Sequence, residues 1–271
     1  MGSLYIRLFV VLNEEKPDSA FYHIALMMLK HMDALQSFSI GELSMICNVS
    51  KSTISKFIRK IGYEDFADFR YAAIFMDNKY RTDINYVDNV MGFLERNSPD
   101  VYFLTVIQDI TATWRNMDWN AVDRLVKDIA EYEEVAAFGY MFSESAALDL
   151  QIKLGFNRKF IFTKQNDLKQ DEYIERAGAD TLIIIFSDSG EYLNRYPCIS
   201  DFTNKRIFDR TKAKIVVVTS NPEVEKDPRV AYYVPYWKTS ALRTHRTVYG
   251  ILTDIIAFRY RQFIRREREQ G

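Results

Sequence analysis

Apolar residues follow two different spacings along the chain. Up to residue 76 they recur every three or four positions, which predicts an almost entirely helical segment. From residue 134 onward, short apolar runs alternate with stretches long enough for helices, which predicts a parallel sheet flanked by helices. Five runs are expected to form its strands: Val135–Phe138, Phe160–Phe162, Thr181–Phe186, Ile215–Thr219 and Ala231–Val234. The expected fold class is therefore an all-helical N-terminal domain followed by an α/β domain with a five-stranded parallel sheet.

Turn and capping signals divide the chain further. The polar stretch from Asp77 to Asp88 is typical of a linker, and Asn97–Asp100 combines a turn with a helix start. Two more helices are expected at 101–117 and 119–132, with Asp118 capping the second. The predicted domains are a helical domain at 1–76, a linker with connecting helices at 77–117, and the α/β domain at 118–271.

Composition excludes several classes of protein. Hydrophobic residues make up 48% and charged residues 27%, and the net charge is −1, so any contact with nucleic acid must come from a local basic surface. The two cysteines, Cys47 and Cys198, lie far apart, which disfavours a disulfide framework or a zinc site and fits a reducing cytoplasm. No run of 18 apolar residues exists, so no membrane span is expected. We expect a cytoplasmic protein without a metal or cofactor.

Residues 39–61 carry the pattern of two short helices joined by a tight turn. Ser39 can cap the first helix, and Ser50 can cap the second after a turn at Asn48-Val49. Gly62 then follows the second helix, where a glycine commonly terminates one. This arrangement is that of a helix-turn-helix.

The second of these helices has two opposed faces. An apolar face consists of Ile54, Phe57, Ile58 and Ile61, and a polar face consists of Ser52, Ser55, Lys56 and Arg59. Four basic residues and no acidic residue lie between positions 50 and 60, which favours a DNA recognition helix over an ordinary solvated basic face. The expected DNA contacts are Ser39, Ser50, Lys51, Ser52, Thr53, Ser55, Lys56, Arg59 and Lys60.

Residues 20–75 resemble the helix-turn-helix of the RpiR/MurR family of transcriptional regulators. The matching elements are Ser-Ile-x-Glu-Leu at 39–43, Val-Ser-x-Ser-Thr-Ile-Ser-Lys-Phe at 49–57 and Lys-Ile-Gly-Tyr-x-x-Phe-x-x-Phe at 60–69. The family usually carries arginine where this chain has Lys56. Because lysine lacks the bidentate fork that reads guanine, the sequence preference is expected to differ.

The resemblance also implies a C-terminal sugar isomerase (SIS) domain, a five-stranded parallel sheet that binds phosphosugars. Phe138–Ser143 stands where the family has Gly-x-Gly-x-Ser, and Ser187–Tyr192 stands where it has Ser-x-Ser-Gly-x-Thr. Both loops follow predicted strands, and open parallel sheets bind ligands at that edge. The expected effector-binding residues are Ser143, Ser187, Asp188, Ser189, Gly190 and Tyr192.

Three positions in these loops depart from the family pattern. Met141 replaces the second glycine, Tyr192 replaces the threonine, and Asp188 adds a carboxylate beside the expected phosphate. A carboxylate there repels a phosphate unless it points away. The loops therefore leave three alternatives: a phosphosugar effector, a changed ligand, or a site that has lost its ligand.

Candidate catalytic groups are scarce. The α/β segment contains a single histidine, His245, and Glu144 is placed to interact with a helix dipole as well as to act as an acid or base. The chain has no phosphate-binding P-loop, no metal-spaced ligands and no nucleophile elbow. We therefore expect a protein that is not an enzyme. A phosphosugar isomerase and a pure interaction module remain the rival hypotheses.

The combined pattern predicts a sequence-specific regulator of a sugar or amino-sugar pathway that binds double-stranded operator DNA. Its affinity would be controlled by a phosphosugar-type effector. The final helical segment, 241–268, carries an apolar stripe for self-association, namely Ile251, Ile255, Phe258 and Gln262 with their neighbours. A homodimer or homotetramer would present paired recognition helices to a near-palindromic operator.

Overall fold

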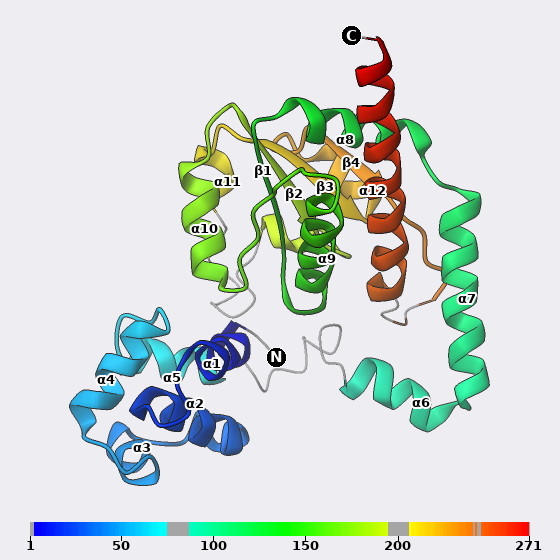
Figure 1. Ribbon diagram of the computed structural model, residues 1–271. Helices are drawn as coiled ribbons and strands as arrows, with labels where there is room; N and C mark the ends of the chain where they lie inside the picture. Colours follow the sequence, from blue (N-terminus) through cyan, green and yellow to red (C-terminus); the bar gives the residue numbers. More distant parts are fainter. Residues whose placement is uncertain (1–2, 75–86, 195–205, 241, 243–244, 271) are drawn as a thin grey trace. The chain divides into compact units, whose positions relative to one another are not determined.

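The computed structural model describes residues 3–74, 87–194, 206–240, 242 and 245–270 (Figure 1). The chain forms two compact units, one built from the N-terminal helices and one built around a parallel sheet. Most of the expected linker at 77–88 lies outside the described residues, as does Cys198. No helix in the described part is long and apolar enough to cross a membrane.

The N-terminal unit is helical, as the apolar spacing predicts. Its helices are α1 (Ser3–Glu14), α2 (Ala20–Lys30), α3 (Ile40–Ile46), α4 (Lys51–Lys60) and α5 (Phe66–Ile74), with a 3₁₀ turn at Met32–Ala34. One apolar face of each helix meets in a shared core, in which the side chains of Leu8, Ile24, Met28, Leu43 and Phe57 are almost fully buried. Burial of this kind supplies most of the stability of short helices, which are marginal on their own.

The second unit alternates helices and strands. Its helices are α6 (Gly92–Arg96), α7 (Pro99–Arg115), α8 (Trp119–Glu131), α9 (Glu144–Gly155), α10 (Asp167–Arg176), α11 (Ile207–Arg210) and α12 (His245–Gln270). Its strands are β1 (Glu134–Gly139), β2 (Thr181–Phe186), β3 (Lys214–Thr219) and β4 (Tyr232–Pro235). Shorter helical segments, numbered η4 to η7, lie at Val87–Met91, Met141–Ser143, Glu191–Leu193 and Pro222–Lys226. Ser98 caps α7 within the expected helix start, and Asp118 caps α8 as expected.

The sheet has four strands in the order β1-β2-β3-β4, all parallel, and not the five that the sequence predicts. The expected strand at Phe160–Phe162 makes only one parallel bridge, between Ala136 and Phe162, beside the outer edge of β1. Phe160 is 80% exposed, and only Ile161 of the three residues is buried. With one core-facing side chain, the segment has too little apolar surface to extend the ladder.

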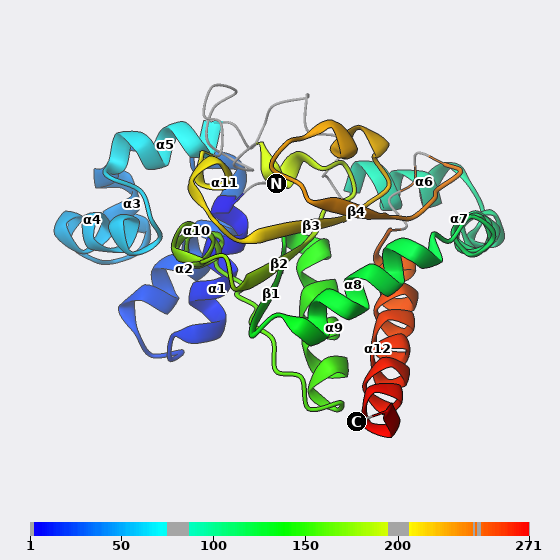
Figure 2. The same ribbon diagram turned by 90° about the horizontal axis from the view of Figure 1, so that it is seen from above.

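Helices cover both faces of this sheet (Figure 2). On one face, α8, α9 and α12 bury Leu125, Leu150 and Leu252 against strand residues such as Ile184. On the other face, α10, α11 and two 3₁₀ segments pack against the alternate strand residues, including Ile183. Strands buried on both sides are uniformly apolar, and this is why β2 reads as Thr-Leu-Ile-Ile-Ile-Phe.

The chain order places both candidate effector loops at one point of the sheet. After β1 the chain runs to the bridge segment on one side of β1, and it then returns to form β2 on the other side. Such a reversal is the usual ligand crevice of an open parallel sheet, outside the carboxyl ends of the strands. Residues 139–143 follow β1 and residues 187–192 follow β2, so both loops lie at this edge.

Candidate DNA-binding surface and effector loops

The predicted helix-turn-helix is formed by α3 and α4. Ser39 and Glu42 make a reciprocal capping box: the Ser39 amide donates to Glu42 Oε2 at 2.7 Å and the Glu42 amide donates to Ser39 Oγ at 3.2 Å. Asn48 turns the chain with a φ of 50°, and Gly62 ends the motif with a φ of 85°. Ser39 is thus occupied in capping, and it also remains exposed.

The two faces of α4 separate as the sequence predicts. Ile54, Phe57 and Ile58 are fully buried in the N-terminal core. Lys51, Ser52, Lys56, Arg59 and Lys60 are exposed, and Thr53 and Ser55 are half-buried. The helix therefore presents a continuous polar and basic surface without a carboxylate of its own.

Hydroxyl groups gather at the start of α4. Ser50 Oγ accepts a hydrogen bond from the Thr53 amide at 3.1 Å and lies 2.8 Å from the hydroxyls of both Ser52 and Thr53. Ser55 Oγ donates to the Lys51 carbonyl at 3.1 Å. Each hydroxyl is held in place by these bonds, and a hydroxyl oxygen has a second lone pair with which to accept a further bond. A helix start of this composition suits phosphate and base-edge contacts.

The four cations of α4 differ in their surroundings. Lys60 forms an ion pair with Glu15, which lowers the pKa of that carboxyl, and its ammonium lies 5.2 Å from the centre of the Phe21 ring. Among the described residues, Lys56 and Arg59 form no ion pair. The same holds for Lys51, whereas part of the Lys60 charge is neutralised within the protein by Glu15.

At the effector loops, Ser143 lies directly before α9 and is buried. The loop crosses over Gly139 so closely that a β-carbon there would lie 2.7 Å from the Ser143 carbonyl group. Any larger residue at 139 would push the start of α9 away from β1. This explains the first glycine of the motif and places the N-terminus of α9 at the sheet edge.

Met141 stands in a conformation that favours glycine. Its φ is 52°, in the left-handed region, where a side chain crowds the backbone. This is the position at which the sequence motif departs from glycine. The loop therefore places a methionine in a strained conformation.

Asp188 is buried and points into a polar network. Its Oδ1 accepts from Ser220 Oγ at 2.8 Å and from the Tyr236 hydroxyl, and its Oδ2 accepts from Lys238 Nζ at 2.7 Å. Burial, together with the nearby Tyr249 and Asp188, raises the pKa of Tyr236, so its hydroxyl stays protonated and donates. The carboxylate charge is thereby balanced within the protein.

Tyr192 is also buried, and its hydroxyl donates to Gln170 Oε1 at 2.5 Å. Gln170 in turn donates from its amide nitrogen to the carbonyls of Gly139 at 3.2 Å and Lys164 at 2.6 Å. The Tyr192 ring stacks on Tyr140 with 4.3 Å between ring centres. Tyr192 therefore ties the two loops together.

The remaining expected effector residues are divided. Ser187 is buried, with its Oγ accepting from the Tyr192 amide at 3.4 Å, and Gly190 is buried with a φ of 78°. Ser189 is exposed. Sequence reasoning missed Gln170, Tyr236 and Lys238, because nothing in their local sequence indicates that they contact these loops.

Glu144, the first residue of α9, is a carboxyl group with an unusual pKa at this edge. Burial raises its pKa to about 7, although a hydrogen bond from Gln165 acts in the opposite direction. At neutral pH this carboxyl group is therefore only partly ionised. Among the described residues, no group of three or more histidine, cysteine or acidic side chains is placed to hold a metal ion.

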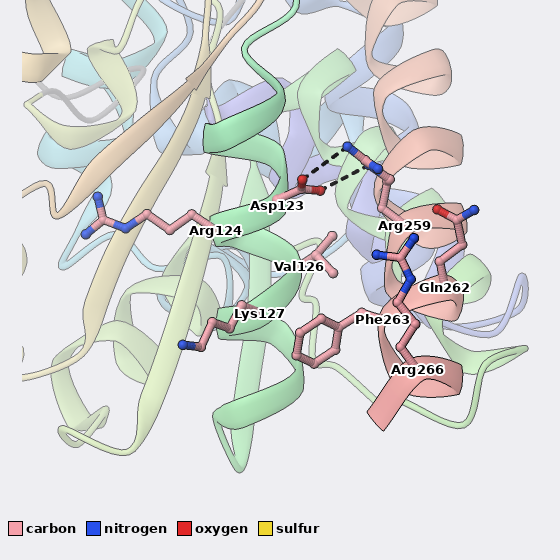
Figure 3. A pocket seen from close by; sticks show the side chains of 8 residues that line it. All are labelled: Asp123, Arg124, Val126, Lys127, Arg259, Gln262, Phe263 and Arg266. Atoms are coloured by element: carbon pink, nitrogen blue, oxygen red, sulfur yellow. Dashed lines mark hydrogen bonds and ion pairs between the residues drawn. The ribbon is translucent and has the colours of Figure 1, made fainter. Parts of the chain in front are cut away.

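A pocket of about 430 Å³ lies elsewhere, between α8 and α12 (Figure 3). Arg259, on α12, forms an ion pair with Asp123 at 3.0 Å. Arg124 and Lys127 point away from the pocket in the figure, and they contact Tyr232 and Glu131 respectively. The pocket contains none of the expected effector residues.

Comparison with known proteins gives a family match for the N-terminal helices. The family model described as "Helix-turn-helix domain, rpiR family" matches residues 14–76. A Providencia stuartii protein named "Uncharacterized HTH-type transcriptional regulator in aarA 3'region" is 23% identical over 195 residues, covering 70% of this chain and 67% of that protein.

Two solved structures are similar over different shares of the chain. The Vibrio vulnificus NanR protein complexed with ManNAc-6P is 16% identical, with a TM-score of 0.48, covering 98% of this chain and 97% of that one. The sugar isomerase domain of an RpiR transcription factor from Sphaerobacter thermophilus is 14% identical, with a TM-score of 0.44, covering 64% of this chain and 99% of that one. The family match spans α2 to α5 and contains both helices of the motif described above. Residues 14–76 of this chain are thus similar to the helix-turn-helix domain of the rpiR family.

Proposed function

We propose that the chain is a sequence-specific, DNA-binding transcriptional regulator that acts in the cytoplasm without catalysis or a cofactor. The observation that carries this proposal is the polar face of α4, where Lys56 and Arg59 are exposed and form no ion pair with a described residue. Within a helix-turn-helix, this face enters the major groove. The relative from Providencia stuartii, named as an HTH-type transcriptional regulator, supports the same function.

The DNA contacts divide into two groups in this proposal. Ser52, Ser55, Lys56 and Arg59 face the groove, and the start of the motif, with Ser39, Ser50, Lys51 and Thr53, meets phosphates. Lys60 contributes least, because Glu15 already balances much of its charge. Phosphate contacts position the protein, and only base contacts select the sequence.

We further propose that the second unit is an SIS-type domain whose loops at 139–143 and 187–192 receive a phosphosugar-type effector. The helix N-terminus at Ser143 and the exposed Ser189 support an anion at this edge, because amides and hydroxyls can bind phosphate without a lysine. Asp188 does not oppose it, since its carboxylate is paired with Lys238. The rival proposal is a domain that has lost its ligand. The hydrogen bond between Tyr192 and Gln170 favours this rival, because it occupies both side chains within the protein.

A regulator of this type would act as a homodimer or homotetramer. Two recognition helices related by symmetry match a near-palindromic operator. The apolar stripe expected on α12 contributes only in part, because Ile251, Ile255 and Gln262 are half-buried in their own unit. Phe258, at 59% exposure, is the member of that stripe left open for a partner.

The DNA proposal is tested by measuring binding of the full chain to its own upstream DNA at two salt concentrations. Arg59→Ala and Lys56→Ala together should weaken binding by about 100-fold and lower the salt slope by about two. Lys30→Ala, which removes an exposed lysine from α2, is the matched control and should change little. Unchanged affinity and salt slope in the double variant would show that α4 does not contact DNA.

The effector proposal needs a separate measurement. A panel of phosphosugars should raise the melting temperature of the full chain and change its DNA affinity, and Ser189→Ala should reduce both effects. A chain without a ligand would show neither effect with any member of the panel. An isomerase would instead turn over a phosphosugar, with activity that survives Lys56→Ala.

A further inference from the structure

The helix α7 exposes an apolar face that its own unit leaves uncovered. The exposed fractions are 64% for Phe103, 58% for Leu104, 55% for Ile107 and 68% for Trp114. Contiguous exposed apolar surface of this size is uncommon on a protein that acts alone. The face therefore requires an explanation beyond the fold.

The opposite face of α7 is firmly attached to the α/β unit. Thr113 Oγ1 donates to the Trp237 carbonyl at 2.7 Å, and the buried Asp109 accepts from the Thr239 amide at 2.6 Å. Figures 1 and 2 both show α7 at the edge of this unit, with α12 on one side of it. The helix is thus anchored to this unit by its opposite face, and its apolar face points away from these contacts.

The spacing on the exposed face is that of a helix-pairing seam. Leu104, Ile107, Thr111 and Trp114 alternate steps of three and four residues, the repeat with which two helices pack side by side. Thr111 fits this seam, because its hydroxyl already donates to the Ile107 carbonyl of its own helix at 2.7 Å. The seam therefore offers no unbonded polar group.

The ends of the seam carry opposite charges. Asp100 lies at the start of α7 and Arg115 at its end; both are exposed, and neither forms an ion pair with a described residue. When two copies of the helix run antiparallel and cross near Ile107, Asp100 of each copy meets Arg115 of the partner subunit. The same arrangement places Leu104 opposite Thr111 of the partner subunit, and it aligns the two helix dipoles favourably.

The surface reaches the lower size limit of a specific pair. Full burial of a phenylalanine or tryptophan covers about 150–250 Å², so Phe103 and Trp114 offer roughly 250 Å² per copy. The exposed aliphatic side chains beside them add roughly 150–200 Å² at the usual size of such groups. Two copies together bury about 1,000 Å² with their polar rims, which is where specific interfaces begin.

We propose that α7 is a self-association surface and that its occupant is α7 of a second copy of this chain, packed antiparallel about Ile107. The contact is isologous, because each copy contributes the same residues. It is distinct from the stripe on α12 and independent of DNA or an effector. It would link two copies whether or not the helix-turn-helix binds an operator.

The experiment measures association of the full chain by analytical ultracentrifugation. Ile107→Lys places two like charges at the crossing point and should raise the dissociation constant of the pair at least about 30-fold. Gln108→Lys adds the same charge to the neighbouring exposed position at the rim, and it should have a much smaller effect.

Charge reversal tests the antiparallel orientation. Asp100→Arg and Arg115→Asp alone should each weaken association about tenfold, and the double variant should restore it, because the pairs re-form with exchanged signs. Ile107→Cys should also form a disulfide between copies under mild oxidation, prepared in a Cys198→Ser background. Cys47 does not compete, because it is buried and its pKa is raised to about 11.

Two results would contradict the proposed pairing of α7. If Ile107→Lys sediments like the unchanged chain and Ile107→Cys gives no cross-linked pair, α7 does not self-associate. If the Asp100→Arg and Arg115→Asp double variant is weaker than either single variant, the helices do not pair antiparallel. Circular dichroism of each variant, expected to be unchanged, separates loss of pairing from loss of folding.

Discussion

The proposed recognition helix and the proposed effector loops use polar side chains in opposite ways. On α4, the serines and cations of the polar face stand at the surface, and Lys56 and Arg59 form no ion pair with any described residue. In the loops after β1 and β2, Asp188 and Tyr192 are buried and bonded to side chains from other elements. The polar groups of α4 remain accessible to a ligand, whereas many polar groups of the loops are bonded within the protein and hold the loops together.

Two motifs that are equally recognisable in the sequence therefore do not support a binding function equally well. Hydrogen-bonding groups that already have buried partners gain little from a ligand, because the ligand must replace bonds of equal strength. Exposed cations can gain much from a ligand, because they release the counterions condensed on DNA when they neutralise its phosphates. The recognition helix is therefore the stronger part of the functional proposal.

The largest effect is expected at Asp188. Asp188→Ala removes the acceptor of Lys238 and of two hydroxyl groups, so the free energy of unfolding of this unit should fall by about 2–4 kcal/mol. Urea unfolding followed by circular dichroism measures it. The exposed neighbour provides the control, since Ser189→Ala should change stability by less than about 0.5 kcal/mol. Equal stability of both variants would contradict the structural role of Asp188.

The next effect concerns two neighbouring cations of α4. Arg59→Ala should weaken DNA binding about tenfold, whereas Lys60→Ala should weaken it no more than about threefold, because the Glu15 carboxylate already balances Lys60. Fluorescence anisotropy with a labelled operator measures both. Conversely, Glu15→Gln should strengthen binding slightly by releasing the Lys60 charge. Equal losses for the two alanine variants would show that the ion pair opens on DNA.

The sequence predicted what depends on neighbours along the chain. The caps at Ser39 and Ser50, the turn at Asn48 and the end of α4 before Gly62 all follow from contacts within a few residues. The four confirmed strands likewise contain short apolar runs. The fifth expected strand at Phe160–Phe162 has the same composition, but its phenylalanines face solvent, and burial is not visible in composition alone.

The loop interiors depend on contacts between distant residues. Asp188 meets Tyr236 and Lys238 about 50 positions later, and Tyr192 meets Gln170 from another helix. Such partners are set by the packing of the whole sheet, so no local pattern could show that the carboxylate turns away from the expected ligand. The sequence drew attention to Asp188 and Tyr192, but it did not indicate which residues they contact.

A smaller effect is expected at Glu144, and it depends on pH. The pKa of this carboxyl is raised from 4.5 to about 7 in the folded chain, so the folded state holds its proton more tightly than the unfolded state does. The carboxylate therefore destabilises the fold above pH 7, and this penalty shrinks as the pH falls and vanishes below about 4.5. Glu144→Gln should stabilise the chain by on the order of 1 kcal/mol at pH 8, after allowance for partial exposure.

At pH 5 the same substitution should change stability much less, and melting curves at the two pH values measure the difference. Glu172→Gln makes the identical change at an exposed glutamate on α10 and should show no such difference. A Glu144 effect that is independent of pH would mean that its carboxyl is solvated. The loops would then be more open than their hydrogen bonds indicate, and the contrast with α4 would weaken.

The smallest effect is expected at Met141, where the effector loop carries backbone strain. With a φ of 52°, Met141→Gly should relieve a left-handed conformation that costs about 1–2 kcal/mol, although glycine returns part of this through its greater freedom when unfolded. A net gain of about 0.5 kcal/mol in unfolding free energy is expected. Asn48→Gly is the matched control at a φ of 50°, and it should gain less, because asparagine tolerates this region. If Met141→Gly instead destabilises the chain, the methionine side chain contributes packing that outweighs its strain, and the departure from glycine strengthens a loop closed around its own residues.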